Sequence, residues 1–305
     1  MNQIRDLGPY YELTSGQSKA RILKKGNNLI SLRREGEPDW IYFPGDPAKP
    51  PEPLLAGNPF LFPWANRLQS DVYYFQKQGH SVDPLLRDAN GLPLHGLMLD
   101  QLWTDFSAEA GQNFVRLDSR FCLDKTHRVY QSFPFRQDIV ISYVLRSESL
   151  HIRTVIVNKG DGPLPLSFGF HPYFRCDVPR HDVRFVLPQA KVVILDESQL
   201  PSGEVRDSRN HWPMEGDELR LPEALDDPLT EFSSGSTFAL RAGPRTLGVR
   251  TRQGFSTLWL YSPGGLHCDF VCLEPMVAPA NALGQETAPV LAAGENFIAD
   301  FTLHF

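Results

Sequence analysis

The sequence predicts an all-β protein built from antiparallel sheets packed as a sandwich or a barrel. Short segments that alternate apolar and polar residues recur along the chain, and they are rich in β-branched and aromatic residues. The 26 prolines and 23 glycines are spread rather than clustered, which indicates many turns. No long stretch combines a helical repeat of apolar residues with capping signals, so we expect few helices, all of them short.

Six segments show the strand pattern most clearly. They are Gln137–Leu145, His151–Val157, Asp182–Leu187, Ser256–Tyr261, Asp269–Leu273 and Asn296–Phe305. The Pro-rich segment Pro44–Pro53 is the nearest candidate for a linker, but it leads directly into an aromatic stretch and is better interpreted as a surface loop. We therefore expect residues 1–305 to form a single large β domain.

The composition excludes several classes of protein. Hydrophobic residues make up 41% and charged residues 22% of the 305 positions, which is typical of a globular protein with a sizeable core. The 30 basic and 36 acidic residues give a net charge of −6, which argues against nucleic acid as the main partner. No apolar run approaches the roughly 18 residues of a membrane helix, and the first residues lack a signal-peptide pattern. We expect a soluble, cytoplasmic protein with no membrane partner.

The cysteines support the same expectation. There are four, Cys122, Cys176, Cys268 and Cys272, with no C-x-x-C pair. They are too few for a disulfide framework, so we interpret them as reduced thiols. Cys268 and Cys272 would share one face of a strand, as packed side chains commonly do.

Two segments in the first third of the chain place polar residues in apolar surroundings. In NPFLFPWANRL, Asn66 and Arg67 follow an apolar run, and an arginine offers a fork of donors for hydroxyl or carboxylate oxygens. In LPLHGLMLDQLW, His95 stands between Leu94 and Gly96. The alternatives are a salt-bridged arginine at the end of a strand and a histidine of the core.

Two further segments add a histidine and a glutamate. In LSFGFHPYFR, His171 is surrounded by aromatic residues that could wall a sugar site or simply build a core. In FVCLEPMVAPANA, Glu274 follows a strand that Pro275 is expected to end. A glutamate in that position needs a partner, a solvated cleft or a function, because an unpaired buried charge is costly.

Together, His95, His171 and Glu274 supply a candidate acid and base, with reference pKa values of about 6.5 and 4.3 that a cleft could draw toward neutrality. Two histidines and a glutamate are also a zinc ligand set, but neither His-x-His nor H-E-x-x-H occurs and the residues are far apart in sequence. Signatures of serine hydrolases, phosphate loops and dinucleotide sites are absent as well. The sequence thus favours an acid/base enzyme that needs neither a metal nor a cofactor.

The segments FPWANR, LPLHGL, FGFHPYF and LEPM, in this order, resemble the motifs of the aldose 1-epimerase (galactose mutarotase) family. A fifth segment, ALDDPLTEF, is similar to a short acidic segment of the same family. The resemblance covers nearly the whole chain. It implies a large antiparallel β-sandwich of the galactose mutarotase type, with an open cleft across one concave sheet.

The resemblance also implies an activity, the interconversion of the α and β anomers of free aldoses such as glucose or galactose. His171 would then be the general acid that protonates the ring oxygen, and Glu274 the general base that takes the proton of the C1 hydroxyl. His95 and Arg67 would bind and orient the sugar, with Asn66 beside Arg67. Asp226, preferred over Asp227, would hold sugar hydroxyls.

Other readings remain open. A branch of the superfamily acts on hexose 6-phosphates and usually has a threonine where this chain has Pro172, so the sequence favours the unphosphorylated branch. Arg67, Arg87 and Arg175 could nevertheless build a phosphate site. A non-catalytic sugar-binding protein on the same scaffold and a metal-dependent β-barrel enzyme are the alternatives from other classes. We expect a small sugar as the partner and either a monomer or a homodimer.

Overall fold

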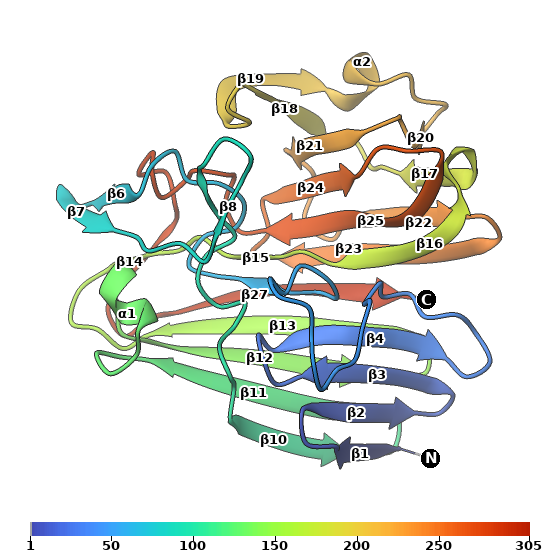
Figure 1. Ribbon diagram of the computed structural model, residues 1–305, viewed down its shortest axis with the longest axis horizontal. Helices are drawn as coiled ribbons and strands as arrows, with labels where there is room; N and C mark the ends of the chain where they lie inside the picture. The colour runs from blue at the N-terminus through green and yellow to red at the C-terminus, as the bar shows by residue number, and fades with distance from the viewer. Residues whose placement is uncertain (1) are drawn as a thin grey trace.

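The computed structural model describes residues 2–305 and consists almost entirely of antiparallel strands arranged in two layers (Figure 1). One layer is a nine-stranded sheet. In spatial order its strands are β10 (Asp105–Ala110), β11 (Val115–Leu123), β12 (Gln137–Leu145), β13 (Ser149–Asn158), β27 (Asn296–His304), β23 (Arg245–Gln253), β22 (Thr237–Ala242), β17 (Val183–Val186) and β20 (Glu218–Arg220).

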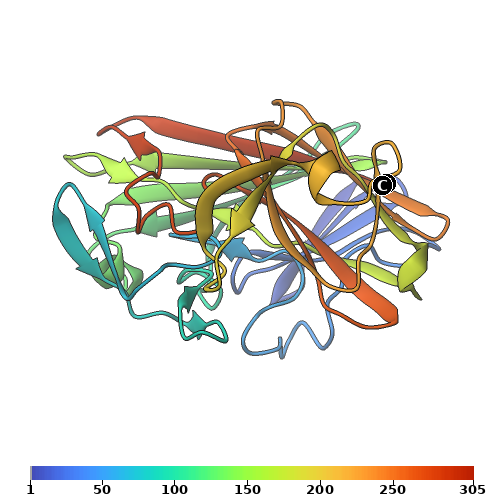
Figure 2. The ribbon, with the colours of Figure 1, turned by 90° about the horizontal axis from the view of Figure 1, so that it is seen from above.

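The other layer contains two sheets that lie side by side over the first (Figures 1 and 2). The smaller has the order β1 (Gln3–Asp6), β2 (Tyr10–Ser15), β3 (Ser18–Leu23) and β4 (Asn28–Arg34). The larger has eight strands, in the order β19 (Pro201–Asp207), β18 (Lys191–Leu195), β21 (Leu225–Thr230), β24 (Thr257–Ser262), β25 (His267–Met276), β15 (Gly169–Phe170) and β5 (Phe60–Leu61), with β16 (Tyr173–Pro179) paired to β25 beside β15. The predicted antiparallel β-sandwich is thus confirmed.

Short elements complete the molecule. The two-stranded pairs are β6 (Val72–Phe75) with β7 (Gln78–Ser81), β8 (Leu86–Arg87) with β9 (Pro93–Leu94), and β14 (Leu164–Pro165) with β26 (Val290–Leu291). The helices are α1 (Val129–Ser132), α2 (Ser208–His211) and the 3-10 turn η1 (Arg180–Asp182), as brief as the sequence predicts. Within residues 2–305, none of them has the length and apolar character of a membrane span.

The predicted strands coincide with observed ones to within a few residues, with one instructive error. The prediction ended a strand before Glu274 because of Pro275, but β25 continues to Met276. Its neighbours on one side are β16, which pairs Tyr173 with Cys272, and β15, which pairs Gly169 with Met276. On that side the ladder pairs Cys272 and Met276 but none of the residues between them. Pro275, which has no N–H group to donate, is therefore accommodated within the strand.

The eight-stranded sheet has one face in the core and one face turned outward. In β24, Leu258 and Leu260 belong to the main core cluster, whereas Trp259 packs in a separate cluster on the opposite face. In β25, Leu273 is a core residue, so the two-residue period puts Glu274 on the outward face together with Trp259, its cross-strand partner. This outward face carries the candidate site.

Candidate active site

A cavity of about 350 Å³ opens on the outward face of the eight-stranded sheet and contains every site residue that the sequence predicts. The residues that line it are Leu55, Asn66, Arg67, Leu94, His95, His171, Tyr173, Asp226, Trp259, Tyr261, Phe270 and Glu274. A somewhat larger cavity, about 420 Å³, lies elsewhere, beside Phe75, Tyr130 and Arg136, and contains none of the predicted residues. The four motifs, far apart in sequence, therefore meet at one place.

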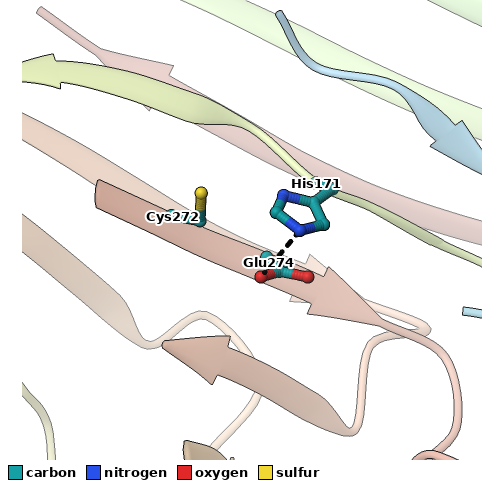
Figure 3. Close-up of side chains that lie close together, drawn as sticks. All are labelled: His171, Cys272 and Glu274. Atoms are coloured by element: carbon teal, nitrogen blue, oxygen red, sulfur yellow. Dashed lines mark ion pairs between the residues drawn. The ribbon is translucent and has the colours of Figure 1, made fainter. Parts of the chain in front are cut away.

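His171 and Glu274 are in direct contact at this site (Figure 3). Glu274 projects from β25, and His171 sits in the short break between β15 and β16, where the chain runs beside that strand. His171 Nε2 lies 3.3 Å from Glu274 Oε1, and the two side chains are 7% and 2% exposed. Among the described residues, Glu274 Oε2 and His171 Nδ1 are buried atoms without a hydrogen-bond partner. Both groups can therefore still bond to a ligand.

Burial shifts both groups toward their neutral forms. Desolvation lowers the pKa of His171 to about 3. Desolvation, reinforced by the nearby Asp226 carboxylate, raises the pKa of Glu274 well above its usual value, and the charge of Arg67 offsets only part of this. The expectation that a cleft could draw both pKa values toward neutrality does not hold for His171. Both shifts favour a neutral Glu274 carboxyl beside a neutral His171 imidazole.

Two rings hold the His171 imidazole in place. Tyr173 stacks on it with ring centroids 4.5 Å apart, and His95 meets it edge-on at 5.0 Å. Desolvation is the main cause that keeps the pKa of His95 well below its usual value, and His171 and Arg67 add to it. His95 is therefore a neutral, polar wall of the cavity.

The segments that carry Arg67 and His95 are joined by backbone hydrogen bonds. His95 N–H donates to the Asn66 carbonyl at 2.9 Å, and Leu97 N–H donates to the Phe62 carbonyl at 2.7 Å. Asn66 and His95 both have positive φ angles, 58° and 61°, which turn the two segments back on one another. This pairing places the arginine and the histidine side by side.

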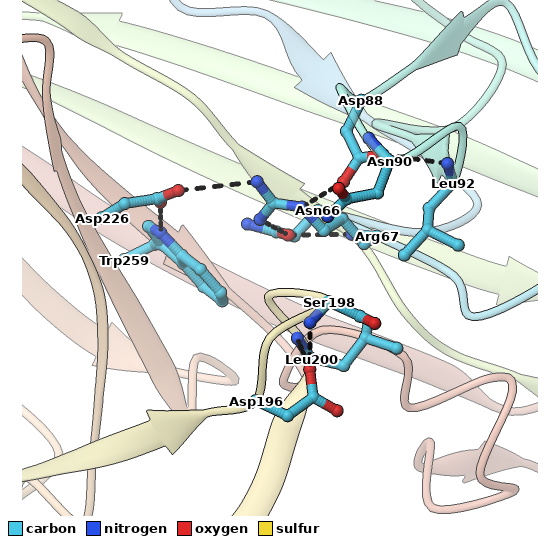
Figure 4. A network of polar contacts seen from close by, with 10 residues as sticks. All are labelled: Asn66, Arg67, Asp88, Asn90, Leu92, Asp196, Ser198, Leu200, Asp226 and Trp259. Atoms are coloured by element: carbon cyan, nitrogen blue, oxygen red, sulfur yellow. Dashed lines mark hydrogen bonds and ion pairs between the residues drawn. The ribbon is translucent and has the colours of Figure 1, made fainter.

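Arg67 is the centre of a polar network (Figure 4). Its Nε donates to Asp88 Oδ2 at 2.8 Å and its guanidinium also donates to Asn66 Oδ1 at 2.9 Å. The remaining nitrogen reaches Asp226 Oδ2 at 3.5 Å, while Trp259 Nε1 donates to the other oxygen of Asp226. The guanidinium is thus fixed in orientation at the side of the cavity.

The structure places Asp226, rather than Asp227, in the cavity. Asp226 pairs with Tyr261 across β21 and β24 and points outward with it, whereas Asp227 alternates to the other face and lies 3.8 Å from His211. Burial is the main cause that raises the pKa of Asp227.

Sequence reasoning missed two parts of the network. Asp88 was not singled out, although its carboxylate accepts from the backbone of Asn90 and Leu92 as well as from Arg67. Burial pushes its pKa upward, but these hydrogen bonds outweigh burial and leave it lowered. The D-x-x-G-L turn around Asp88 was a signal that this residue caps a loop. Trp259, which donates to Asp226, is the second part that was missed. The alternation of side chains within β24 was the signal that could have placed it on the outward face.

Cys272 adds a donor that the sequence did not connect with the site. Its sulfur, a ring nitrogen of His171 and a carboxylate oxygen of Glu274 all lie within 4.8 Å of one another (Figure 3). The wide separation of the candidate ligands in sequence argued against a metal site. The fold nevertheless brings His171 close to Cys272 and Glu274. Cys272 is a buried free thiol, as expected, and so are Cys176 and Cys268, whereas Cys122 is exposed.

Comparisons with known proteins agree with this architecture. The family model for aldose 1-epimerase matches residues 9–304, nearly the full length of the chain. The chain belongs to the aldose 1-epimerase family. It is 28% identical over 288 residues to the uncharacterized protein YihR of Escherichia coli (strain K12), covering 90% of this chain and 86% of that protein.

Solved structures show that this aldose 1-epimerase family member has the galactose mutarotase-like fold. A galactose mutarotase-like protein from Clostridium acetobutylicum superimposes with a TM-score of 0.85 at 17% identity, covering 100% of this chain and 98% of the other. A galactose 1-epimerase from Lactobacillus acidophilus NCFM gives a TM-score of 0.77 at 18% identity, covering 100% and 97%. At such identities the likeness concerns the fold.

Proposed function

We propose that this protein catalyses the interconversion of the α and β anomers of a free aldose of the glucose or galactose type. The observation that carries the proposal is the buried contact between His171 and Glu274 at the base of a cavity of about 350 Å³, large enough for one monosaccharide. Tyr173, Tyr261 and Phe270 supply aromatic walls for a sugar ring. Family membership supports the same chemistry.

Ring opening requires two proton transfers. His171 gives a proton to the ring oxygen O5 while Glu274 takes the proton of the C1 hydroxyl, so the C1–O5 bond breaks and a C1 carbonyl forms. Rotation about C1–C2 presents the other face of the aldehyde. His171 then removes the proton from the O5 hydroxyl as O5 attacks C1, and Glu274 returns its proton to the carbonyl oxygen. Each residue ends in its starting state.

With both groups neutral, the pair already holds the proton that this cycle needs. A protonated Glu274 beside a neutral His171 contains as many protons as a carboxylate beside an imidazolium. The two arrangements differ by one proton transfer across the 3.3 Å contact. A bound sugar favours the charged arrangement, because the C1 hydroxyl donates to the Glu274 carboxylate and the imidazolium donates to O5.

The remaining polar residues orient the sugar. Arg67 is fixed by Asp88 and Asn66, and Asp226 is fixed by Trp259, so each presents a defined set of donors or acceptors to the cavity. His95, held edge-on to His171, adds a neutral polar edge. Preorganised groups of this kind lower the entropic cost of reaching the reactive geometry.

The cavity favours an unphosphorylated substrate. Among the described residues, Arg67 is the one cationic side chain that lines it, and Arg67 is already paired with Asp88 and Asp226. Arg87 pairs with Asp71 and Arg175 with Asp177, and neither lines the cavity. A phosphate dianion would need a cation that is free to bind it.

Polarimetry of freshly dissolved α-glucose and α-galactose tests the proposal. We expect the wild type to accelerate equilibration, and Glu274→Gln and His171→Asn each to lose at least about a hundredfold in turnover, the lower end of what positioned proton transfer provides. Exposed residues give matched controls: Glu35→Gln and His181→Asn should keep wild-type rates. Circular dichroism of each variant shows whether the fold persists.

Three results would count against the proposal. Wild-type rates in both site variants would remove His171 and Glu274 from the mechanism. Tight galactose binding with equilibration at the buffer rate would identify a sugar-binding protein instead. NMR of α-glucose 6-phosphate provides the remaining comparison, and faster equilibration of the phosphorylated sugar than of free glucose would assign the chain to hexose-6-phosphate mutarotation.

A further inference from the structure

Cys272 is a buried thiol beside the candidate active site, and the proposed anomer interconversion does not use it. It lies two residues before Glu274 in β25 and shares its face of the sheet (Figure 3). His171, Cys272 and Glu274 each offer one ligand atom, and these atoms lie within 4.8 Å of one another. The three residues are 6%, 0% and 1% exposed. A nitrogen, a sulfur and an oxygen donor thus face one small volume.

Two independent features favour a cation in this volume. Glu274 Oε2 is buried without a hydrogen-bond partner, so the carboxylate has unused acceptor capacity. The pocket also has more acidic than basic side chains: Asp226 and Glu274 line it together with Arg67, whose charge is already shared with Asp88.

We propose that His171, Cys272 and Glu274 form a binding site for a soft divalent cation of the Zn²⁺ type, and that such an ion inhibits the enzyme reversibly. Three mixed N, S and O ligands leave one tetrahedral position open toward the cavity. Binding of the ion and of the sugar would be mutually exclusive, because both engage His171 and Glu274. The inhibitory part rests on the proposed function, whereas the binding site does not.

The donor set determines which ions bind and how pH acts. A thiolate and an imidazole select Zn²⁺ or Cd²⁺ over Mg²⁺ and Ca²⁺, which prefer oxygen ligands. Cys272 and Glu274 must release their protons to the solvent when they bind the metal, so binding should tighten as pH rises.

Cd²⁺ binding measures the site without any reference to activity. Titration of the reduced full-length protein with Cd²⁺ should produce a thiolate-to-metal charge-transfer band in the ultraviolet at a stoichiometry of one, and excess galactose should weaken it. Cys272→Ser should weaken Cd²⁺ binding by at least about tenfold, the lower end of what losing even an outer-shell partner costs. Cys272→Ala provides a second variant in case the serine hydroxyl disturbs packing.

Two other thiol variants identify the sulfur involved. Cys122→Ser removes the exposed thiol and should leave the band unchanged. Cys268→Ser tests the neighbouring buried thiol of the same strand. A band that survives Cys272→Ser and Cys272→Ala but is lost in Cys268→Ser would overturn the assignment, and so would a wild-type protein without any band.

The inhibition is tested separately by polarimetry. Zn²⁺ should slow equilibration of α-glucose, EDTA should restore the rate, and Mg²⁺ should have no effect. Cys272→Ser, which keeps His171 and Glu274, should retain basal turnover and resist Zn²⁺. If Cd²⁺ binds as described but the protein lacks turnover, the proposed function fails and the metal site stands. If turnover is present and insensitive to Zn²⁺ in the wild type, the inhibition is wrong.

Discussion

At the level of single residues, burial shifts the pKa values of His171 and Glu274 in opposite directions. Burial disfavours charge, so it lowers the pKa of His171 to about 3 and raises that of Glu274 well above its usual value. The sequence identifies both residues and their reference values but contains no measure of their burial. Because an unfolded histidine titrates near pH 6.5, His171 should destabilise the protein as pH falls from about 6.5 toward 3.

The shift of Glu274 predicts a pH-dependent stability difference. A folded-state pKa above the unfolded value means that the stabilising contribution of the neutral carboxyl is complete below about pH 4.5 and is lost as pH rises toward the folded pKa. Glu274→Gln cannot ionise, so it should become increasingly more stable than the wild type as pH rises above about 4.5. Urea denaturation at several pH values measures the difference.

Glu35→Gln, at a carboxylate already in solvent, serves as the control for this measurement. Its free energy of unfolding should follow that of the wild type across the same range. A stability difference for Glu274→Gln that stays constant, or that shrinks as pH rises, would show that Glu274 is not held neutral in the native state.

At the level of elements, short irregular segments position the charged and polar groups over a regular sheet. The Asp88 turn and the paired segments around Asn66 and His95 contribute few strand residues, yet they hold Arg67 and His95 over β25. The regular strands are predictable from their two-residue period, as β12 shows by matching the predicted Gln137–Leu145. The partners of a turn carboxylate are not predictable in this way, because they depend on which loops pack together.

Asp88 is a positioning residue for Arg67, and its removal should affect substrate binding more than turnover. Asp88→Asn weakens the charge-assisted bond to Arg67, a contribution of roughly 1.5–3 kcal/mol. KM for the aldose should therefore rise by about tenfold or more, with a smaller change in kcat. Asp71→Asn, at the exposed Arg87 pair, is the matched control and should change neither constant. If Asp88→Asn instead lowered kcat by about tenfold and left KM unchanged, that result would argue against the positioning role.

Gly96 is required where the His95 segment crosses the Phe62 segment. Its φ is +72°, and a Cβ there would lie 2.2 Å from the Phe62 carbonyl oxygen. Gly96→Ala should cost about 1–3 kcal/mol for the backbone conformation alone and more for the clash. Gly36→Ala isolates the conformational part, since Gly36 has φ +81° and open space around it. Equal losses in the two variants, measured by urea denaturation, would refute the close approach.

At the level of the whole molecule, the two layers separate stability from chemistry. The inner face of the eight-stranded sheet packs against the nine-stranded sheet, with Phe170 and Phe301 rings 5.3 Å apart across the layers. Its outer face does not pack against the nine-stranded sheet and carries the polar cavity. One strand, β25, serves both faces, with Leu273 in the core and Glu274 in the cavity. The expectation that residues 1–305 form one domain stays a prediction.

The sequence by itself determined the antiparallel β architecture, the family and the residue types of the candidate site, because alternation, turn residues and local motifs are properties of neighbouring positions. It placed the end of a strand at Glu274, since Pro275 alone does not reveal that the ladder skips that position. Only the tertiary structure decided that Glu274 and His171 are in contact, that Asp226 rather than Asp227 enters the cavity, and that the Cys272 thiol lies close to both His171 and Glu274. These properties depend on burial and on distances between remote segments, which packing alone sets.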